Sequence, residues 1–510
     1  MQLNQFNGGL NIRVSPYLIA TNEAQICSNM DVASISLSGL PTDRAEGNNF
    51  GSNSSFIFYK GQWVAKPSTT DFVEYNNILY SSDGVSVPQK TNDGINFFNL
   101  GITTPVSRPS ITALNSIPSD NKEELKYRQY VYTYYNSNDG SESAPSPLSE
   151  EVKYIEEGFT VGNFILPTDS QVTSIRLYRV GGDLSIFTLV DTITSPYSDY
   201  TDNKLDIDIA GNHQLDTTNA GQAPQGISHI VENMSMLFGT KGNSLYYTDV
   251  AKPNNWSPYY FINFKYDITG LGSTQNGLLV FTKNATYIVS GNSPMTLSMS
   301  LLHNSQGCIN HKTIKYINNV LVWLSLDGIC TSSGARVEVL SYNKLGRLTV
   351  SSVDAEIYDG RYFLFYSGGT KVLDYRFGNP IFYDLDLQVT GSYYDEKIDL
   401  LYYTDLSGNL YSLFQGNDIR NYSYKTGKLA DGSASMRKNY NDIYMFSTGV
   451  LEYKIYIDDV QVTSGTLVQG YNQVNVPKSH SFGYHIEFEF SGKGSLIELE
   501  YKVEGRQNGR

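Results

Sequence analysis

The chain has 510 residues, a formal net charge of −14 and 40% hydrophobic residues, which predicts about two to four domains rather than a single core. Lys and Arg are scattered along the sequence, which disfavours a nucleic-acid-reading protein, because such proteins neutralise phosphates with a basic patch. The 40 Tyr and 23 Phe, together with the near absence of helical periodicity, predict an all-β fold.

Residues 1–107 are predicted to hold an N-terminal strand and the first blades of a β-propeller. The first six residues have neither a basic region nor an apolar core, so we expect no signal peptide. Two hairpins follow, one turning at Lys60-Gly61 and one at Asn76-Asn77. Short apolar strands joined by tight polar turns recur later in the chain, which is why we assign this region to the propeller.

Residues 108–205 are predicted to form an inserted β-sandwich. Strands alternate with turns over roughly 100 residues, as in antiparallel sandwiches. The strand at 130–135, the Pro-containing phrase at 142–147 and the strand at 175–179 resemble a fibronectin type III module. Modules of that kind are mostly spacers or adhesion surfaces, so the resemblance implies a mechanical role and no particular chemistry.

Residues 206–424 are predicted to hold the remaining propeller blades. Three hairpins recur here, and their second strands start at Leu245, Tyr287 and Ile329, so both intervals are 42 residues. A hairpin repeat of about 40–45 residues is typical of propeller blades, which must stack on neighbours to bury their faces. Further hairpins bring the expected number to about five to seven blades. The longest apolar run, 320–326, is far shorter than the roughly 20 residues of a membrane span, so none is expected.

Residues 425–510 are predicted to form a small C-terminal β-sandwich. The stretches 485–490 and 496–501 alternate strictly between apolar and polar residues. A period of two with one polar face is the pattern of a half-exposed sheet.

Histidines and cysteines show no spacing typical of a metal site. The histidines are His213, His229, His303, His311, His480 and His485, and the cysteines are Cys27, Cys308 and Cys330. None of them forms an HExxH, HxH or Cys/His motif, so we predict no metal site and no cofactor. The odd number of cysteines favours buried thiols in a reducing compartment.

Acidic residues offer the remaining route to catalysis. Asp249, Asp327 and Asp359 are candidates for the paired carboxylates of a glycosidase. All three lie beside glycines or in turns, where Asp is favoured for its own backbone hydrogen bonds. The acidic loops 136–140 and 202–208 do not have the spacing of an EF-hand. We therefore predict no catalytic residues and a chain that is not an enzyme.

An ordered set of short sequences carries a family resemblance. It comprises Ala223-Pro224, the strand 245–249 followed by 253–256, the turn 267–272, and 306–308 before Asp327-Gly328, and the N-terminal phrase 29–32 adds to it. In this order they resemble the nozzle, or tubular tail protein, family of short-tailed phages.

The resemblance implies a structural virion protein of the phage tail, assembled in the host cytoplasm. It implies a homohexameric ring below the portal and adaptor, in contact with tail fibre proteins, through whose lumen viral DNA is ejected without sequence-specific binding. One alternative is a glycan- or receptor-binding tail protein, which aromatic rings gathered in one exposed pocket would favour over rings buried between blades. The other is an envelope-degrading hydrolase, which a converging pair of buried carboxylates would favour.

Overall fold

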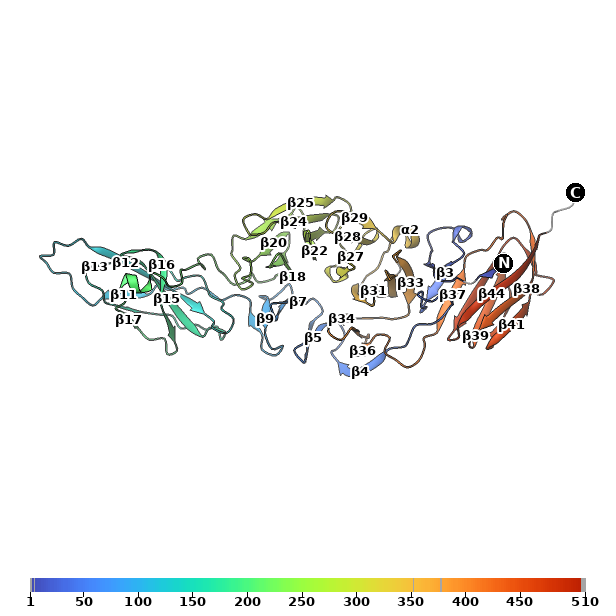
Figure 1. Ribbon diagram of the computed structural model, residues 1–510, viewed down its shortest axis with the longest axis horizontal. Helices are drawn as coiled ribbons and strands as arrows, with labels where there is room; N and C mark the ends of the chain where they lie inside the picture. Colours follow the sequence, from blue (N-terminus) through green and yellow to red (C-terminus); the bar gives the residue numbers. More distant parts are fainter. Residues whose placement is uncertain (1, 4, 352, 377, 506–510) are drawn as a thin grey trace.

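The computed structural model describes residues 2–3, 5–351, 353–376 and 378–505 and shows three β-rich regions in a row (Figure 1). The propeller lies in the middle, the inserted sandwich at one end and the C-terminal sandwich at the other. The described helices are short: η1 (Pro16–Leu18), α1 (Asp206–Ile209), η2 (His311–Thr313) and α2 (Tyr342–Leu345). No helix among the described residues has the length and apolarity to span a membrane. The all-β prediction is confirmed.

The propeller comprises, within the described residues, five four-stranded sheets, four strands of a larger sheet and one two-stranded hairpin. In order around the ring they are β5–β6 (Ser54–Tyr59, Gln62–Pro67); β7–β10 (Asp71–Tyr75, Ile78–Ser82, Gln89–Thr91, Phe98–Asn99); β18–β21 (Ser228–Asn233, Met236–Lys241, Ser244–Tyr247, Phe261–Asn263); β22–β25 (Ile268–Thr274, Gly277–Thr282, Thr286–Ser290, Ser298–His303); β26–β29 (Lys315–Ile317, Val320–Ser325, Gly328–Ser332, Val337–Val339); β30–β33 (Asp354–Tyr358, Arg361–Tyr366, Gly369–Asp374, Ile381–Leu385); and β34–β36 (Gly391–Asp395, Leu400–Thr404, Asn409–Ser412) with β4 (Arg44–Asn49). Around the centre, β7 contacts β18, β18 contacts β22, β26 contacts β30, and β34 contacts β30 and β5, whereas β22 contacts the second strand β27.

The 42-residue repeat is confirmed as a blade repeat. The strands β20, β24 and β28 are the third strands of three consecutive blades. Within the second strand β23, Leu278 and Val280 pack toward the preceding blade, whereas Leu279 and Phe281 pack toward the following one. A strand buried on both faces needs a continuous apolar run, and this is why the sequence shows one here.

The inserted sandwich joins two adjacent blades, β7–β10 and β18–β21. Its two sheets are β11–β14–β17 (Ser110–Ala113, Phe159–Gly162, Tyr200–Asp202) and β13–β12–β15–β16 (Val152–Tyr154, Lys126–Tyr135, Ser174–Gly181, Leu184–Thr194). Tyr130, Tyr132 and Phe159 belong to the core between them. The module contacts the propeller through an ion pair between Asp139 and the buried Lys90.

The C-terminal sandwich includes the N-terminal strands. One sheet contains β1 (Gln2–Leu3), β44 (Leu496–Gly505), β38 (Lys438–Ser447), β41 (Gly470–Asn475) and β42 (Phe482–Gly483). The facing strands are β2 (Gly9–Leu10), β3 (Glu23–Ser28), β37 (Tyr422–Thr426), β43 (Ile486–Gly492), β39 (Leu451–Ile457) and β40 (Val460–Leu467), and they continue the sheet of blade β30–β33. Phe488 and Tyr501 pack between the two sheets, with ring centroids 5.3 Å apart. The first strands of the chain therefore belong with its last ones rather than with a blade.

Candidate functional site

The first strands of the blades surround two adjoining cavities of about 750 and 780 Å³ at the centre of the propeller. Both cavities are lined by Asp71, His311, Lys312 and Asp354, so these residues lie where the two meet. We call the two cavities together the channel of the propeller. A propeller gathers the first strand of every blade around its centre, and this brings together residues that are distant in sequence.

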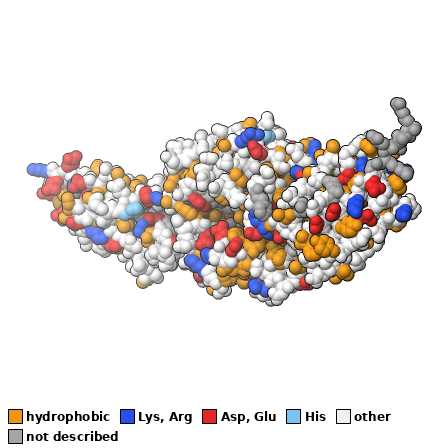
Figure 2. All heavy atoms as spheres, turned by 45° about the vertical axis from the view of Figure 1, so that its right-hand side comes forward, with side chains coloured by type: hydrophobic (Ala, Val, Ile, Leu, Met, Phe, Trp, Pro, Cys, Tyr) orange, Lys and Arg blue, Asp and Glu red, His pale blue; other side chains and the backbone are white. Residues whose placement is uncertain are grey.

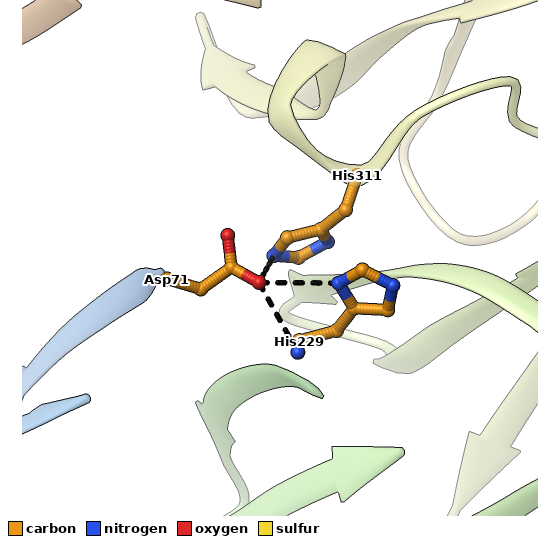
Figure 3. Close-up of side chains that lie close together, drawn as sticks. All are labelled: Asp71, His229 and His311. Carbon is orange, nitrogen blue, oxygen red and sulfur yellow. Dashed lines mark hydrogen bonds and ion pairs between the residues drawn. The ribbon is translucent and has the colours of Figure 1, made fainter. Parts of the chain in front are cut away.

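Asp71, His229 and His311 converge at this place from three parts of the ring (Figure 3). Asp71 begins β7, His229 lies in β18 and His311 begins η2. Oδ2 of Asp71 lies 3.1 Å from Nδ1 of His229 and 3.8 Å from Nε2 of His311. The two imidazole rings pack against each other with centroids 4.5 Å apart.

The backbone at His229 is distorted in a way that turns its side chain toward Asp71. His229 has a φ of +57°, and the pairing of β18 with β19 shifts register between Ser228 and Val231. Positive φ is unfavourable for a non-glycine residue, and bulges of this kind redirect side chains near functional sites. The backbone N–H of His229 also donates to Oδ2 of Asp71, at 3.1 Å, which holds the distortion in place.

Hydrogen bonding decides which nitrogen of each ring carries the proton. The backbone N–H of Leu271 donates to Nδ1 of His311 at 3.2 Å, so the neutral ring carries its proton on Nε2, toward Asp71. An ionised carboxylate only accepts, so His229 donates from Nδ1 and keeps a lone pair on Nε2. The His229 side chain is 24% exposed and lines the larger cavity.

Burial and neighbouring charges shift the pKa values of Asp71 and His311 in this cluster. Burial lowers the pKa of His311 to about 3, although Asp71 acts in the opposite direction. For Asp71, burial acts to raise the pKa, but His311, His229 and Lys312 outweigh it and lower the pKa to about 2. The cluster is therefore one carboxylate held by imidazole and backbone N–H groups.

Two chemical roles can be compared for this arrangement. A divalent cation needs a lone pair on Nε2 of His311, which would place a proton on Nδ1 against the Leu271 N–H, so the three residues fit a metal poorly. A carboxylate that holds Nδ1–H of an imidazole whose Nε2 faces a cavity is the arrangement of a general base and its orienting group. The geometry thus favours proton transfer at Nε2 of His229.

Further charged groups line the same channel. Nζ of Lys312 donates to Oγ of Ser55 at 2.8 Å, and Nζ of Lys315 lies 2.9 Å from Oε2 of Glu356. Burial acts to lower the pKa of Lys315, but Glu356 and Asp354 outweigh it and raise the pKa, so the ammonium stays charged. Both cationic and anionic groups therefore line the two cavities.

The acidic residues considered from the sequence do not meet in this channel. Asp249 accepts from Asn255, and Asp327 accepts from Gln306 and Arg347. Asp359 pairs with Arg361 and Arg376 at a turn. Asp139, Asp202 and Asp206 of the two acidic loops pair with Lys90, Arg179 and Arg128. Cys27, Cys308 and Cys330 are buried free thiols, as expected.

The residues that do meet gave no sequence signal. His229 and Asp71 are 158 residues apart, and the insertion lies between them. No local motif spans such a separation. The sequence could have indicated this cluster only if each residue had been placed at the inner end of its blade. That placement needs the blade boundaries to within about a residue.

No family model and no curated protein sequence matches the chain significantly. Similar solved structures include a glycoside hydrolase family 43 arabinoxylan arabinofuranohydrolase from Bacillus subtilis, with 10% identity and a TM-score of 0.20 over 80% of this chain and 96% of that one. BamB from Moraxella catarrhalis has 10% identity and a TM-score of 0.23, over 59% of this chain and 97% of that one. The dihydro-haem d1 dehydrogenase NirN has 11% identity and a TM-score of 0.29, over 72% and 80%.

The prediction that the chain is not an enzyme is contradicted, since a hydrolase and a dehydrogenase are among these structures. Separately, Asp71, His229 and His311 lie close together although no sequence motif links them. Similarity this distant transfers no substrate or reaction to the chain. The propeller assignment rests on the strand pairing described above.

Proposed function

We propose that the chain is a structural protein of a phage tail that assembles with copies of itself into a ring, below the portal and adaptor, through which viral DNA passes. The observation that carries the proposal is the ordered resemblance to the nozzle family. Apart from the phrase 29–32, its pieces run through three consecutive blades, and two of them contact each other, since Nε2 of Gln306 donates to Oδ2 of Asp327 at 2.8 Å. The resemblance thus lies in residues that build the blades.

The packing of the three Trp residues supports this proposal over glycan binding. Trp256 and Trp323 are buried, and Trp63 packs 5.1 Å from the ring of Tyr402 on a neighbouring blade. A glycan-binding face needs rings that are free to stack on sugars. In the propeller these rings instead hold blades together, which agrees with a scaffold under mechanical load.

The C-terminal sandwich offers open sheet edges for contact with a second copy. Among the described strands, β40 pairs only with β39 and lies at the end of its sheet. Val460 and Val468, at the two ends of this edge, are 58% and 60% exposed. An open edge with apolar residues and unpaired backbone groups favours pairing with another chain.

The surface charge suits the lumen of a ring through which DNA passes. Figure 2 shows Lys and Arg side chains dispersed among Asp and Glu on the face that it presents, without an extended basic area in the described part of that face. A net charge of −14 per chain leaves little gain from counterion release, so DNA would pass without adhering.

Native mass over a concentration series, with negative-stain images, tests the proposal. A ring of six copies of the 56.9 kDa chain has a mass of about 341 kDa and a central hole. Val460→Lys together with Val468→Lys should reduce ring formation, whereas the control Val106→Lys, at an exposed valine near the insertion, should not. A chain that stays monomeric, both alone and with portal and adaptor, contradicts the proposal.

A second candidate function is hydrolysis in the channel of the propeller, and the Asp71–His229 pair favours it. His229 would take a proton from water at Nε2 while Asp71 holds Nδ1–H. The water oxygen would bond to the anomeric carbon as the glycosidic C–O bond breaks, and protonated His229 would return its proton to the departing oxygen. Release of soluble sugar from bacterial envelope polysaccharide should then be lost in His229→Asn and kept in the control Asp249→Asn. Equal release by both variants, or none by the unmodified chain, contradicts this function.

A further inference from the structure

A second cluster of titratable groups lies in the C-terminal sandwich, well away from the channel. Asp459 is in the turn between β39 and β40, His485 directly precedes β43, and Glu487 is the second residue of β43. Because side chains two residues apart in a strand point to the same face, His485 and Glu487 project together toward that turn. One ligand-type atom from each of the three lies within 4.8 Å of the other two.

Two buried atoms in this cluster have no hydrogen-bond partner among the described residues. They are Nε2 of His485 and Oε2 of Glu487, whose side chains are 3% and 1% exposed. Nε2 of His485 lies 3.6 Å from Oδ1 of Asp459, too far for a hydrogen bond. Buried polar atoms are normally satisfied, so two unpartnered atoms in one cluster indicate a missing partner.

The remaining polar atoms of the same side chains are already engaged. Nδ1 of His485 lies 3.0 Å from the Tyr17 hydroxyl and 3.3 Å from Oδ1 of Asp458. Oε1 of Glu487 accepts from Nε2 of Gln25 at 2.6 Å. A carboxylate on the far nitrogen of an imidazole orients the ring and leaves the near nitrogen as a lone pair, the usual outer sphere of a metal-bound histidine.

The turn that carries Asp459 is shaped to present carboxylates. Asp458 and Asp459 both have positive φ, +49° and +67°, as the central residues of a two-residue hairpin turn require. The Asp458 carboxylate accepts from the backbone N–H of Tyr484 at 2.7 Å, which ties the turn to the segment before β43. Asp459 is 64% exposed and gives the cluster an opening to solvent.

Two lysines border the cluster and set its charge. Nζ of Lys428 lies 2.6 Å from Oδ1 of Asp459, and Nζ of Lys425 lies 3.6 Å from Oε2 of Glu487. With Asp458 included, three carboxylates lie beside the two ammonium groups of Lys425 and Lys428, so the carboxylates outnumber the ammonium groups by one. A divalent cation would relieve that excess, and Lys428 would compete with it for Asp459.

We propose that Asp459, His485 and Glu487 form a zinc site. One imidazole nitrogen and two carboxylate oxygens are donors that Zn²⁺ accepts, and a water molecule would complete four-coordination on the open side. A contraction of the three donor atoms toward one centre would bring them to the required distance of about 2.0–2.2 Å. The ion would tie the β39–β40 turn to β43 and, through Tyr17 and Gln25, to the N-terminal segment.

Calorimetric titration of the full chain with ZnCl₂ tests the proposal, with Co²⁺ absorption as a second readout of the ligand set. The unmodified chain should bind one ion, and Glu487→Gln should weaken binding by on the order of 100-fold. His480→Asn, at a nearby histidine outside the cluster, and Asp71→Asn, in the channel cluster, should both bind as the unmodified chain does. Equal affinity in Glu487→Gln, or no binding by the unmodified chain, overturns the proposal.

Weaker zinc binding by Glu487→Gln could also result from misfolding, so a second variant is needed that should bind zinc more tightly. Lys428→Gln removes the cation that competes for Asp459 and should tighten zinc binding by about 10-fold. If a protonated His485 occupied the cluster in place of a metal, zinc binding should become weaker in Lys428→Gln. The loss of Lys428 would then leave the imidazolium as the main partner of Asp459. Unchanged or weaker zinc binding in Lys428→Gln overturns the proposal.

Discussion

The inserted sandwich and the propeller channel both bury charged side chains, but they do so with different residue types. In the sandwich, Arg128 and Arg179 are fully buried and paired with Asp202, Asp206 and Glu157. In the channel, the carboxylate of Asp71 meets the imidazoles of His229 and His311 beside a cavity. Permanent charges that are fully paired fix a structure, whereas titratable groups beside a cavity respond to protons and ligands.

The largest effect is expected from breaking the pairs in the sandwich. Arg179→Met leaves Asp202 and Asp206 buried without this cation and should lower the free energy of unfolding of the module by about 3–5 kcal/mol. Amide hydrogen exchange in β12 and β15 measures this directly. The double variant Arg179→Met/Asp202→Leu removes both charges and should lose less; an equal loss in both variants would show that pairing is not the cause.

The channel should instead show a dependence on pH. The pKa of His311 is about 3 in the folded chain and about 6.5 when exposed, so the unfolded chain takes up a proton first as the pH falls. Stability is therefore highest above pH 6.5 and should fall by up to about 1.4 kcal/mol per pH unit below it. Asp71, with its pKa of about 2, adds a further loss between about pH 4 and 2.

Urea midpoints at pH 7, 6, 5 and 4 measure this slope. His311→Asn should flatten it, and His303→Asn, at a histidine on the outer strand β25, should leave it unchanged. A slope that survives in His311→Asn would place its origin in another group.

A smaller effect is expected from removing the shared acceptor in the channel. Asp71→Asn exchanges a carboxylate that accepts from the backbone and Nδ1 of His229 for a neutral amide. Bonds to charged groups contribute about 1.5–3 kcal/mol, so unfolding at pH 7 should become easier by a similar amount. Thermal unfolding followed by Trp fluorescence measures the loss, because all three Trp residues lie in the propeller. No loss at pH 7 would mean that the cluster carries no net stabilisation.

The smallest effect is expected at exposed pairs. Arg347 is 69% exposed and lies 2.6 Å from Oδ1 of Asp327. Such pairs typically contribute less than about 1 kcal/mol, so Arg347→Ala should shift the urea midpoint only slightly. A loss as large as that of Asp71→Asn would show that this turn matters more than its exposure implies.

The sequence predicted the parts of the fold that local patterns encode. The hairpins around Asn284 and Asp327 recur at blade spacing because each blade needs the same turn chemistry and the same doubly buried strand. The pairing of β1 with β44 had no such signal, because strand pairing between the two ends of a chain leaves no periodic trace. The number of blades was equally hidden, since the ring is closed by a strand from an earlier part of the chain.

The candidate site could not be predicted from the sequence for related reasons. His229 and His311 meet Asp71 only because β7, β18 and η2 lie around one centre, and His229 reaches it through a bulge with positive φ. His485 and Glu487 do stand two apart in an alternating strand, a readable sign of a shared face. The sequence did not indicate that Asp459 lies beside His485 and Glu487, because the position of its turn depends on how β39 pairs with β43.

The strand β4 has a consequence for biosynthesis. It closes the blade β34–β36 across a wide gap in sequence, as in the contact between Asn49 and Asn409, which are 360 residues apart. At about 5–20 residues per second, a ribosome takes on the order of 20–70 s to make the intervening chain. Throughout that interval the segment around Arg44–Asn49 has left the ribosome without its partner strand, so holding it free of other β-rich chains becomes a task for chaperones during synthesis.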